Sequence, residues 1–247
     1  MSLLVPPLRL QARHLPTRPS TIFSTLLPQS YEQSHRHVVV QLGGYWGSQG
    51  LAQDINIKGL VGNQYTLTNN NSGNGLFGLG YYIDGPDKDR FQLGYGINGF
   101  YLSTTPVNGT IILEHFLTNF NYSYDIQHIP VYMAAKAIIK NNHQKYNMTL
   151  DAGIGPNFMR VSNYNESPLT DGALAKANFA AHNNVTFSAM AGVGVRLNNT
   201  FGQAPLECAY RFFYLGQGQM QINNNLYQNT LKTGSTYANA ILCSITV

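Results

Sequence analysis

Long stretches of the chain after about residue 37 alternate between bulky residues and small or polar ones. From Leu206 to Tyr214 every second residue is apolar or aromatic, and the residues between them include Glu207 and Arg211. From Tyr237 to Val247 a bulky set again alternates with a small or hydroxylic set. A period of two is the pattern of a β-strand with two unlike faces. A soluble sheet would bury the bulky face and a membrane barrel would turn it to lipid, so this hairpin alone leaves both alternatives open.

Eight segments of this kind are predicted, and long connections alternate with short ones along the whole series. This rhythm is typical of an up-and-down barrel with external loops at one end and tight turns at the other. A β-sandwich or lipocalin has no reason to separate its loops by length in this way. The predicted strands are Val38–Trp46, Leu76–Ile83, Phe91–Ser103, Ile129–Lys140, Tyr146–Val161, Val185–Leu197, Leu206–Gly216 and Thr236–Val247.

The predicted connections contain two further elements besides loops. Alternating aromatics at Phe120, Tyr122 and Tyr124 offer an extension of the fourth strand beyond the main sheet, within an otherwise long connection. An Ala-rich stretch near Asp171 to Ala181 predicts a short helix in an external loop. The fold class is therefore all-β: an eight-stranded antiparallel up-and-down transmembrane β-barrel with one short external helix. The short turns are expected at Asp84–Asp87, Asn141–Gln144 and Asn198–Ala204.

Composition favours the membrane alternative. Only 11% of the residues are charged, against roughly 25% in ordinary soluble proteins, while Gly and Tyr are abundant. No window approaches the roughly 20 apolar residues of a spanning helix, so any membrane crossing is made by strands. The net charge of +4 and the pI near 9.0 are not accompanied by a basic run with aromatics or by a nucleic-acid-binding motif, so we expect no nucleic-acid partner.

The first 36 residues differ from the rest of the chain. They are rich in Pro, Arg, His and Leu, they contain five prolines, and their first acidic residue is Glu32. The apolar run from Leu3 to Leu10 is broken by Pro6 and Pro7, so a secretory signal is not recognisable, and a transit peptide or a misassigned start remain alternatives. We expect residues 1–36 to lie outside the barrel and to be mostly disordered, and residues 37–247 to form one barrel domain.

The strand faces opposite the bulky residues carry an unusual set of charges. Five charged residues share this inward parity across four consecutive strands, and they form either a network that plugs the lumen or the paired filling that any narrow barrel requires. We expect Glu207 to pair with Arg196 rather than with Arg211, and Asp151 to engage Arg196 or Lys136. The full inward polar set is Gln41, Gln92, Asn98, Lys136, Asp151, Arg196, Glu207 and Arg211.

The candidate chemical motifs are weak. Cys208 and Cys243 are either a cross-strand disulfide or two packed free thiols, and we favour the thiols. Gly94 to Gly99 matches G-x-G-x-x-G within a strand pattern, where a dinucleotide site would need a turn that opens a helix. His35 and His37 are the only local histidine pair, and Glu114 with His115 makes a poor dyad because neighbours on an extended chain face opposite ways. We expect no cofactor, no metal and no enzymatic activity.

Three sequence stretches resemble a known family. They are Leu206-Glu-Cys-Ala-Tyr-Arg-Phe-Phe-Tyr-Leu-Gly216, Ala189-Met-Ala-Gly-Val-Gly-Val195 and Leu150-Asp-Ala-Gly-Ile-Gly155. The closing hairpin and the glycine-bearing strands are similar to those of the Opa-like and OmpA-like small outer-membrane barrels. The resemblance covers about Val38 to Val247, and it implies a Gram-negative outer-membrane location and insertion by the barrel-assembly machinery. Family members commonly end on an aromatic residue, whereas this chain ends on Ile245-Thr-Val247.

Three functions from different classes follow. The first is a non-enzymatic, porin-like surface protein whose lumen is closed by the charged network, and whose external loops serve adhesion or envelope integrity. Its partners would be outer-membrane lipid, lipopolysaccharide and host surface molecules. The second is a narrow channel for small or apolar solutes, as in the OmpW-like relatives, which the inward charges disfavour. The third is a lipid-modifying barrel enzyme, for which no triad is found by spacing. We favour the first.

Overall fold

The computed structural model describes residues 35–68, 71–141, 145–170, 175–201 and 204–247. These residues form strands, turns and loops, and none of them is helical. No helix in this part of the chain is therefore long and apolar enough to cross a membrane. The long strands are β1 (Arg36–Ser48), β4 (Asn71–Lys88), β5 (Phe91–Leu113), β6 (Leu117–Ile139), β7 (Tyr146–Pro168), β9 (His182–Phe201), β10 (Ala204–Gln219) and β12 (Lys232–Thr246).

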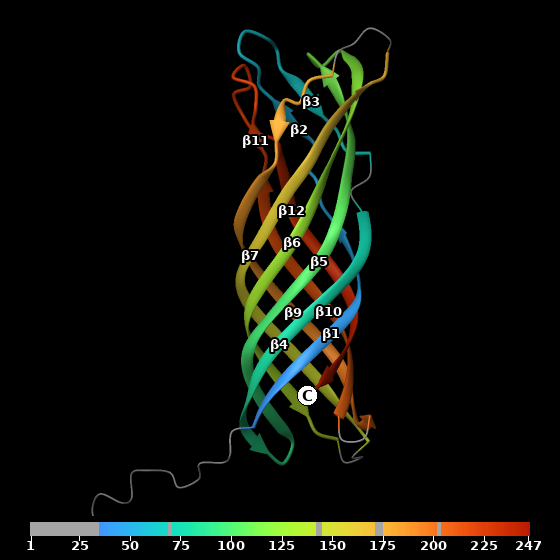
Figure 1. The fold of residues 1–247 in the computed structure, drawn as a ribbon, viewed down its shortest axis with the longest axis vertical. Helices are drawn as coiled ribbons and strands as arrows, with labels where there is room; N and C mark the ends of the chain where they lie inside the picture. The colour runs from blue at the N-terminus through green and yellow to red at the C-terminus, as the bar shows by residue number, and fades with distance from the viewer. Residues whose placement is uncertain (1–34, 69–70, 142–144, 171–174, 202–203) are drawn as a thin grey trace, which may run out of the picture. The chain divides into compact units, whose positions relative to one another are not determined.

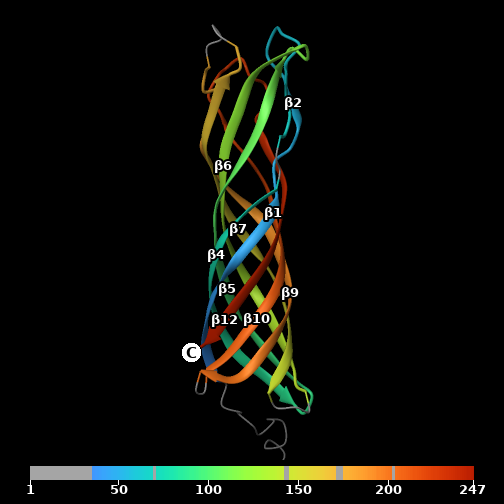
Figure 2. The ribbon, with the colours of Figure 1, turned by 90° about the vertical axis from the view of Figure 1, so that its right-hand side faces the viewer.

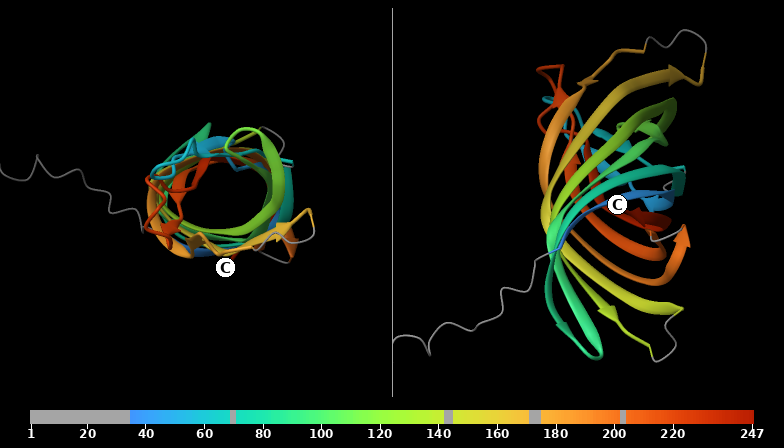
Figure 3. Two further views of the ribbon diagram at one scale, coloured as in Figure 1. Left: turned by 90° about the horizontal axis from the view of Figure 1, so that it is seen from above. Right: turned by 60° about the horizontal axis from the view of Figure 1, so that its bottom comes forward.

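The eight long strands form one closed antiparallel ring. Each pairs with the next one along the chain, in the order β1, β4, β5, β6, β7, β9, β10, β12, and β12 pairs back with β1. Closure leaves these strands without a free edge, which removes the row of unpaired backbone groups that invites aggregation. Figures 1 and 2 show the strands winding steeply around a common axis, and Figure 3 shows them end on. The predicted all-β, antiparallel, up-and-down sheet is confirmed.

The two ends of this closed sheet carry different connections between the strands. At the end we call the turn side, the connections from β4 to β5, β6 to β7 and β9 to β10 are short, and the C-terminus lies beside them (Figure 1). The opposite end, the loop side, carries the remaining connections and four short strands. These are β2 (Gln53–Ile55), β3 (Asn63–Tyr65), β8 (Phe179–Ala180) and β11 (Gln221–Ile222).

The third connection is not the long loop that the sequence predicts. β5 runs on to Leu113 and β6 begins at Leu117, so the two strands form a tall hairpin on the loop side. β7 likewise continues to Pro168, beyond the predicted end at Val161. The predicted extension of the fourth strand through Phe120 is present. Alternation continues along β5, β6 and β7, and β6 pairs with both neighbours there. Sequence patterning found the strands but ended them too early.

Two other local predictions are wrong. Asp84 to Asp87 is not the turn: β4 continues to Lys88, and the register with β5 shifts between Asp84 and Asp87. Pro86 lacks a backbone N–H, so a bulge rather than a regular ladder accommodates it. The predicted helix at 171–181 is not seen in its described part, where Phe179 lies in β8 and is buried among tyrosine rings. Residues 1–34, 171–174 and the centres of the predicted turns, at 142–144 and 202–203, lie outside the described residues.

Candidate functional site

The outer face of β6 changes from polar to apolar halfway along the strand, while its inner face stays largely apolar. Every even-numbered side chain from Phe120 to Ile138 is buried, so one parity faces the interior throughout. On the loop side the inward residues are aromatic or aliphatic, such as Tyr122 and Ile126, and the outward ones are Asn121, Ser123, Asp125 and Gln127. On the turn side the inward set includes Lys136, and the outward set is Ile129, Val131, Met133, Ala135, Ala137 and Ile139. The outer face of β6 is therefore polar in the loop-side half and apolar in the turn-side half, and we call the turn-side half the inverted half.

The inverted half extends around the whole ring. Each of the eight long strands exposes large apolar side chains on its outer face there, and Met133 is 77% exposed. A contiguous apolar surface of this extent is rare on soluble monomers. One such residue from each strand is Leu42, Phe77, Ile97, Met133, Ile154, Phe187, Phe212 and Ile241.

A chain of hydrogen bonds crosses the interior of this half. Arg211 on β10 donates from Nε and Nη2 to Oδ2 of Asp151 on β7, at 3.0 and 2.5 Å, and from Nη1 to Gln41 on β1. Gln41 donates to Oδ1 of Asn98 at 2.7 Å, and Asn98 donates to the hydroxyl of Tyr82 at 3.1 Å. The chain thus links five strands, and Arg211 at its centre has 0% of its surface exposed.

A second ion pair lies beside the first. Nζ of Lys136 is 2.8 and 2.9 Å from the two carboxylate oxygens of Glu207, and both side chains are buried. Lys136 also lies 5.4 Å from the ring centroid of Tyr82, which joins it to the chain above. On the other side, the Arg211 guanidinium lies 5.3 Å from the ring centroid of Phe100. Cations over aromatic faces are stabilised by the ring quadrupole.

The pairing differs from the sequence prediction, which joined Glu207 to Arg196 and Asp151 to Arg196 or Lys136; Asp151 pairs with Arg211 instead. Glu207 and Arg196 are direct neighbours in the β9–β10 register, yet Glu207 pairs across the interior with Lys136. Arg211 reaches Asp151 over β9 because the residue between them is Gly192, which pairs with both. A Cβ at Gly192 would clash with the Asp151 carboxylate and lie 2.7 Å from Cγ of Arg211. The ion-pair partners inside a narrow barrel therefore depend on the size of the side chains between them as well as on the strand register.

Two members of the predicted set lie apart from these pairs. Arg196 is half-buried near the turn side, forms no ion pair among the described residues, and has a buried Nε without a hydrogen-bond partner there. Gln92 is also half-buried, opposite Asp87 and Ile138 at the end of the ladder. Tyr82 was missed because both parities of β4 are apolar in this region. Only its position in register with Gly96, beside the inward Asn98, distinguishes it.

Cys208 and Cys243 form a disulfide, which corrects the prediction of two free thiols. They are directly opposite in the β10–β12 register with Cα atoms 4.0 Å apart, and both lie on the outer face. The sequence placed both on the bulky parity but could not fix the register across the loop from Gln217 to Ser235.

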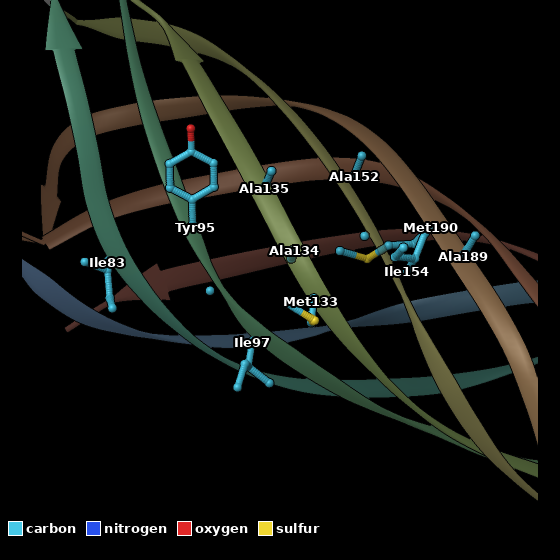
Figure 4. Close-up of a pocket in the computed structure, with 12 residues that line it drawn as sticks. Ile83, Tyr95, Ile97, Met133, Ala134, Ala135, Ala152, Ile154, Ala189 and Met190 are labelled. Atoms are coloured by element: carbon cyan, nitrogen blue, oxygen red, sulfur yellow. The ribbon is translucent and has the colours of Figure 1, made fainter.

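The outer apolar face is hollowed where small side chains meet. A groove of about 730 Å³ crosses β5, β6, β7 and β9, bordered by Tyr95, Met133 and Ile154 and floored by alanines and glycines (Figure 4). Ala135 and Ala152 pair across β6 and β7 in this floor. The groove belongs to the inverted half.

The remaining sequence motifs do not form a binding or catalytic site in the described part of the chain. Gly94 to Gly99 lies inside β5, so it opens no helix. Glu114 and His115 have positive φ values, 49° and 60°, at the tip of the β5–β6 hairpin, and His115 lies 3.9 Å from Asp54. No group of three or more potential metal ligands occurs among the residues that the structure describes.

No protein-family model matches the sequence, and no curated protein is similar to it by sequence comparison. Similar solved structures include outer membrane protein OprG from Pseudomonas aeruginosa, at 14% identity over 87% of this chain and 97% of that one, with a TM-score of 0.48. Neisserial surface protein A matches at 10% identity over 85% and 96%, with a TM-score of 0.42. The outer membrane protease OmpT from Escherichia coli matches at 8% identity over 85% and 95%, with a TM-score of 0.46.

By name, two of these neighbours are outer membrane proteins and one is a surface protein. One of them is a protease, and at these identities and TM-scores the likeness carries no argument about the function of this chain.

Proposed function

We propose that the chain is a non-enzymatic outer-membrane β-barrel. It crosses the bilayer with the turn-side half of its strands, is closed inside by its charged network, and presents the loop-side half to water for contacts at the cell surface. The observation that carries this proposal is the change of the outer face of β6 from polar to apolar. A strand whose outward residues change from Asn121 and Asp125 to Ile129 and Met133 passes from water into an apolar solvent. A soluble protein has no reason to turn an apolar outer face to its surroundings along half of one strand.

The strand lengths fit a partial crossing. A tilted strand needs about 9 to 11 residues to cross the hydrocarbon core, and the outward apolar stretch of β6 is Ile129–Ile139. β5, β6 and β7 each contain 23 residues, about twice that requirement. The upper half of each must therefore stand in water, where its inward aromatics form an ordinary core. The disulfide agrees with an oxidising compartment such as the periplasm.

Closure of the interior is supported at two levels. In the inverted half, Arg211 and Phe213 are fully buried, and the aromatic rings of Phe100, Tyr132 and Phe213 pack 5.3 to 6.2 Å apart next to the ion pairs. In the loop-side half a second apolar cluster lies between the strands. Among the described residues, no hydroxyl or thiol is hydrogen-bonded to a histidine, which is the arrangement that acyl transfer requires.

Refolded protein in planar bilayers tests closure. Wild type is expected to show heat-modifiable gel migration, the sign of a closed barrel, and no single-channel steps. A double Lys136→Ala and Glu207→Ala variant, which removes one complete pair and leaves no lone buried charge, is expected to conduct more than wild type. Stable conductance by the wild-type protein would instead favour the narrow channel.

Labelling of intact cells tests the orientation. Phe116, at the β5–β6 tip, is 85% exposed, and a Phe116→Cys variant is expected to react with a membrane-impermeant maleimide. The matched turn-side variant Asn141→Cys, also exposed, is expected to react only after the outer membrane is permeabilised. The opposite result would reverse the orientation.

A further inference from the structure

A cavity of about 230 Å³ lies in the loop-side half, away from the charged network. It is enclosed by β3, the upper ends of β5, β6 and β7, and the loop segments around residues 57–60, 176–178 and 224–227. Its volume is that of about seven or eight water molecules, since each occupies about 30 Å³ in the liquid. Leu60, Lys176 and Leu226 line it and are exposed, so its mouth opens to the surroundings of the loop side.

The cavity contains a buried carboxylate. Glu166 lines it and is 8% exposed. Its Oε1 accepts hydrogen bonds from the hydroxyl of Tyr164 and from Nδ2 of Asn178 at 3.0 Å, and its Oε2 accepts a longer contact from the same Nδ2, 3.3 Å. Among the described residues no lysine, arginine or histidine forms an ion pair with it. A carboxylate retains acceptor capacity in this arrangement, and burial without a counter-charge is costly.

A bulge in β7 places this carboxylate inside. Below it, Met159 and Val161 face inward on the odd parity, whereas above it the even residues Tyr164 and Glu166 do. Asn163 adopts φ 55° at the change, where the register with β6 shifts. Bulges re-aim side chains and are over-represented next to functional sites. A regular strand would have turned Glu166 outward to water.

A cluster of aromatic rings lines and backs the cavity that holds the carboxylate. Phe179 is the hub, with ring centroids 6.0 Å from Tyr65, 5.4 Å from Tyr164 and 5.5 Å from Tyr227, all edge to face. Tyr65 and Tyr227 line the cavity, as does Phe120. Aromatic faces beside an acidic group are the environment that binds organic ammonium ions. Ile57, Ile111, Leu113 and Leu226 supply apolar lining to the same cavity.

We propose that this cavity binds a small organic amine. The ammonium group donates to Glu166 between the rings of Tyr65 and Tyr227, and the hydrocarbon part lies against Ile111 and Leu113. Lys176, at the exposed rim, is the intramolecular cation that would compete for the same carboxylate. The inference deepens the proposed function by naming the ligand class of its water-facing end.

Isothermal titration calorimetry of refolded protein tests it with benzylamine and with benzyl alcohol, its neutral analogue. The detergent is a maltoside, which carries no ammonium group, and empty micelles correct for partitioning. Benzylamine is expected to bind at least tenfold more tightly than benzyl alcohol. Glu166→Gln is expected to lose that preference, while Asp89→Asn, at an exposed carboxylate between β4 and β5 on the turn side, retains it. Lys176→Gln is expected to bind benzylamine as well as or more tightly than wild type.

A second variant addresses the cavity without touching its polar end. Leu226→Trp, at the exposed mouth, is expected to weaken benzylamine binding at least tenfold while leaving heat-modifiable migration unchanged. Equal binding of amine and alcohol, or unchanged binding in both Glu166→Gln and Leu226→Trp, would overturn the proposal. The measurement needs no bilayer and no conductance, so its failure is distinguishable from failure of the membrane assignment.

Discussion

The water–lipid boundary along β6 is tested by placing the same charge on the same face at two heights. Met133 and Ser123 both point outward from β6, ten positions apart. At about 3.3 Å per residue and a tilt of about 40°, this separation is about 25 Å along the barrel axis, close to the height of the apolar band of such barrels. Met133 should therefore lie within the hydrocarbon region and Ser123 outside it.

An arginine at the lipid-facing midplane of a barrel costs about 2 to 4 kcal/mol, and the cost falls to about 0 to 1 kcal/mol near the interface. Met133→Arg is therefore expected to lower the free energy of unfolding by about 3 kcal/mol, more than a hundredfold in the folding equilibrium. Ser123→Arg is expected to change it by less than about 0.5 kcal/mol, as exposed surface substitutions do.

Urea unfolding from phospholipid vesicles, followed by tryptophan fluorescence, measures both. Trp46 is the only tryptophan in the chain and faces outward from β1, so its emission reports the surrounding solvent. The denaturant slope should be unchanged in both variants, which shows that the folded states are comparable. Equal losses for the two variants, or a loss below about 0.5 kcal/mol for Met133→Arg, would refute the placement of the boundary.

Three further results are expected. Glu207→Ala should lower the free energy of unfolding by about 3 to 5 kcal/mol, because it leaves the Lys136 ammonium buried and unpaired; a loss below about 1 kcal/mol in the same vesicle assay would indicate a hydrated interior. The Cys208–Cys243 bond closes a loop of sequence separation 35, so its reduction should cost about 3 to 4 kcal/mol, and denatured protein should take up a maleimide only after reduction. Burial raises the pKa of the Glu166 carboxyl. The stability that this group contributes should therefore be lost as the pH rises from the unfolded pKa of about 4.3 through the raised folded pKa. The slope of the free energy of unfolding against pH in this range should disappear in Glu166→Gln.

The strands and the inward charges could be predicted because successive side chains of a strand point to opposite faces of the sheet, and the two faces meet different surroundings. Lys136, Asp151, Glu207 and Arg211 all stood on the parity opposite the bulky residues, and all are buried. Their partners could not be predicted. Adjacent strands suggested Glu207 with Arg196, but a ring allows contacts across its interior, and Gly192 leaves the space through which one such pair forms.

The cavity residues were missed for a different reason. Alternation assigns the inward face only when the strand has no bulge. The bulge at Asn163 moves the later residues of β7 to the other face. Tyr164 and Glu166 therefore face inward. An asparagine tolerates the left-handed conformation better than most residues, but nothing in the sequence distinguished Asn163 from the many other asparagines. The same limit applies to the disulfide, since register across a long loop is not a local property.

The charged groups inside the barrel differ between its two halves. In the inverted half the interior combines an apolar cluster with the paired charges of Arg211–Asp151 and Lys136–Glu207. In the loop-side half the interior combines a second apolar cluster with buried amides such as Asn63 and Asn178. Glu166 is buried there, and its hydrogen-bond partners among the described residues are neutral. A carboxylate held there against its desolvation cost, beside an open cavity, is best explained by a ligand that supplies the missing cation.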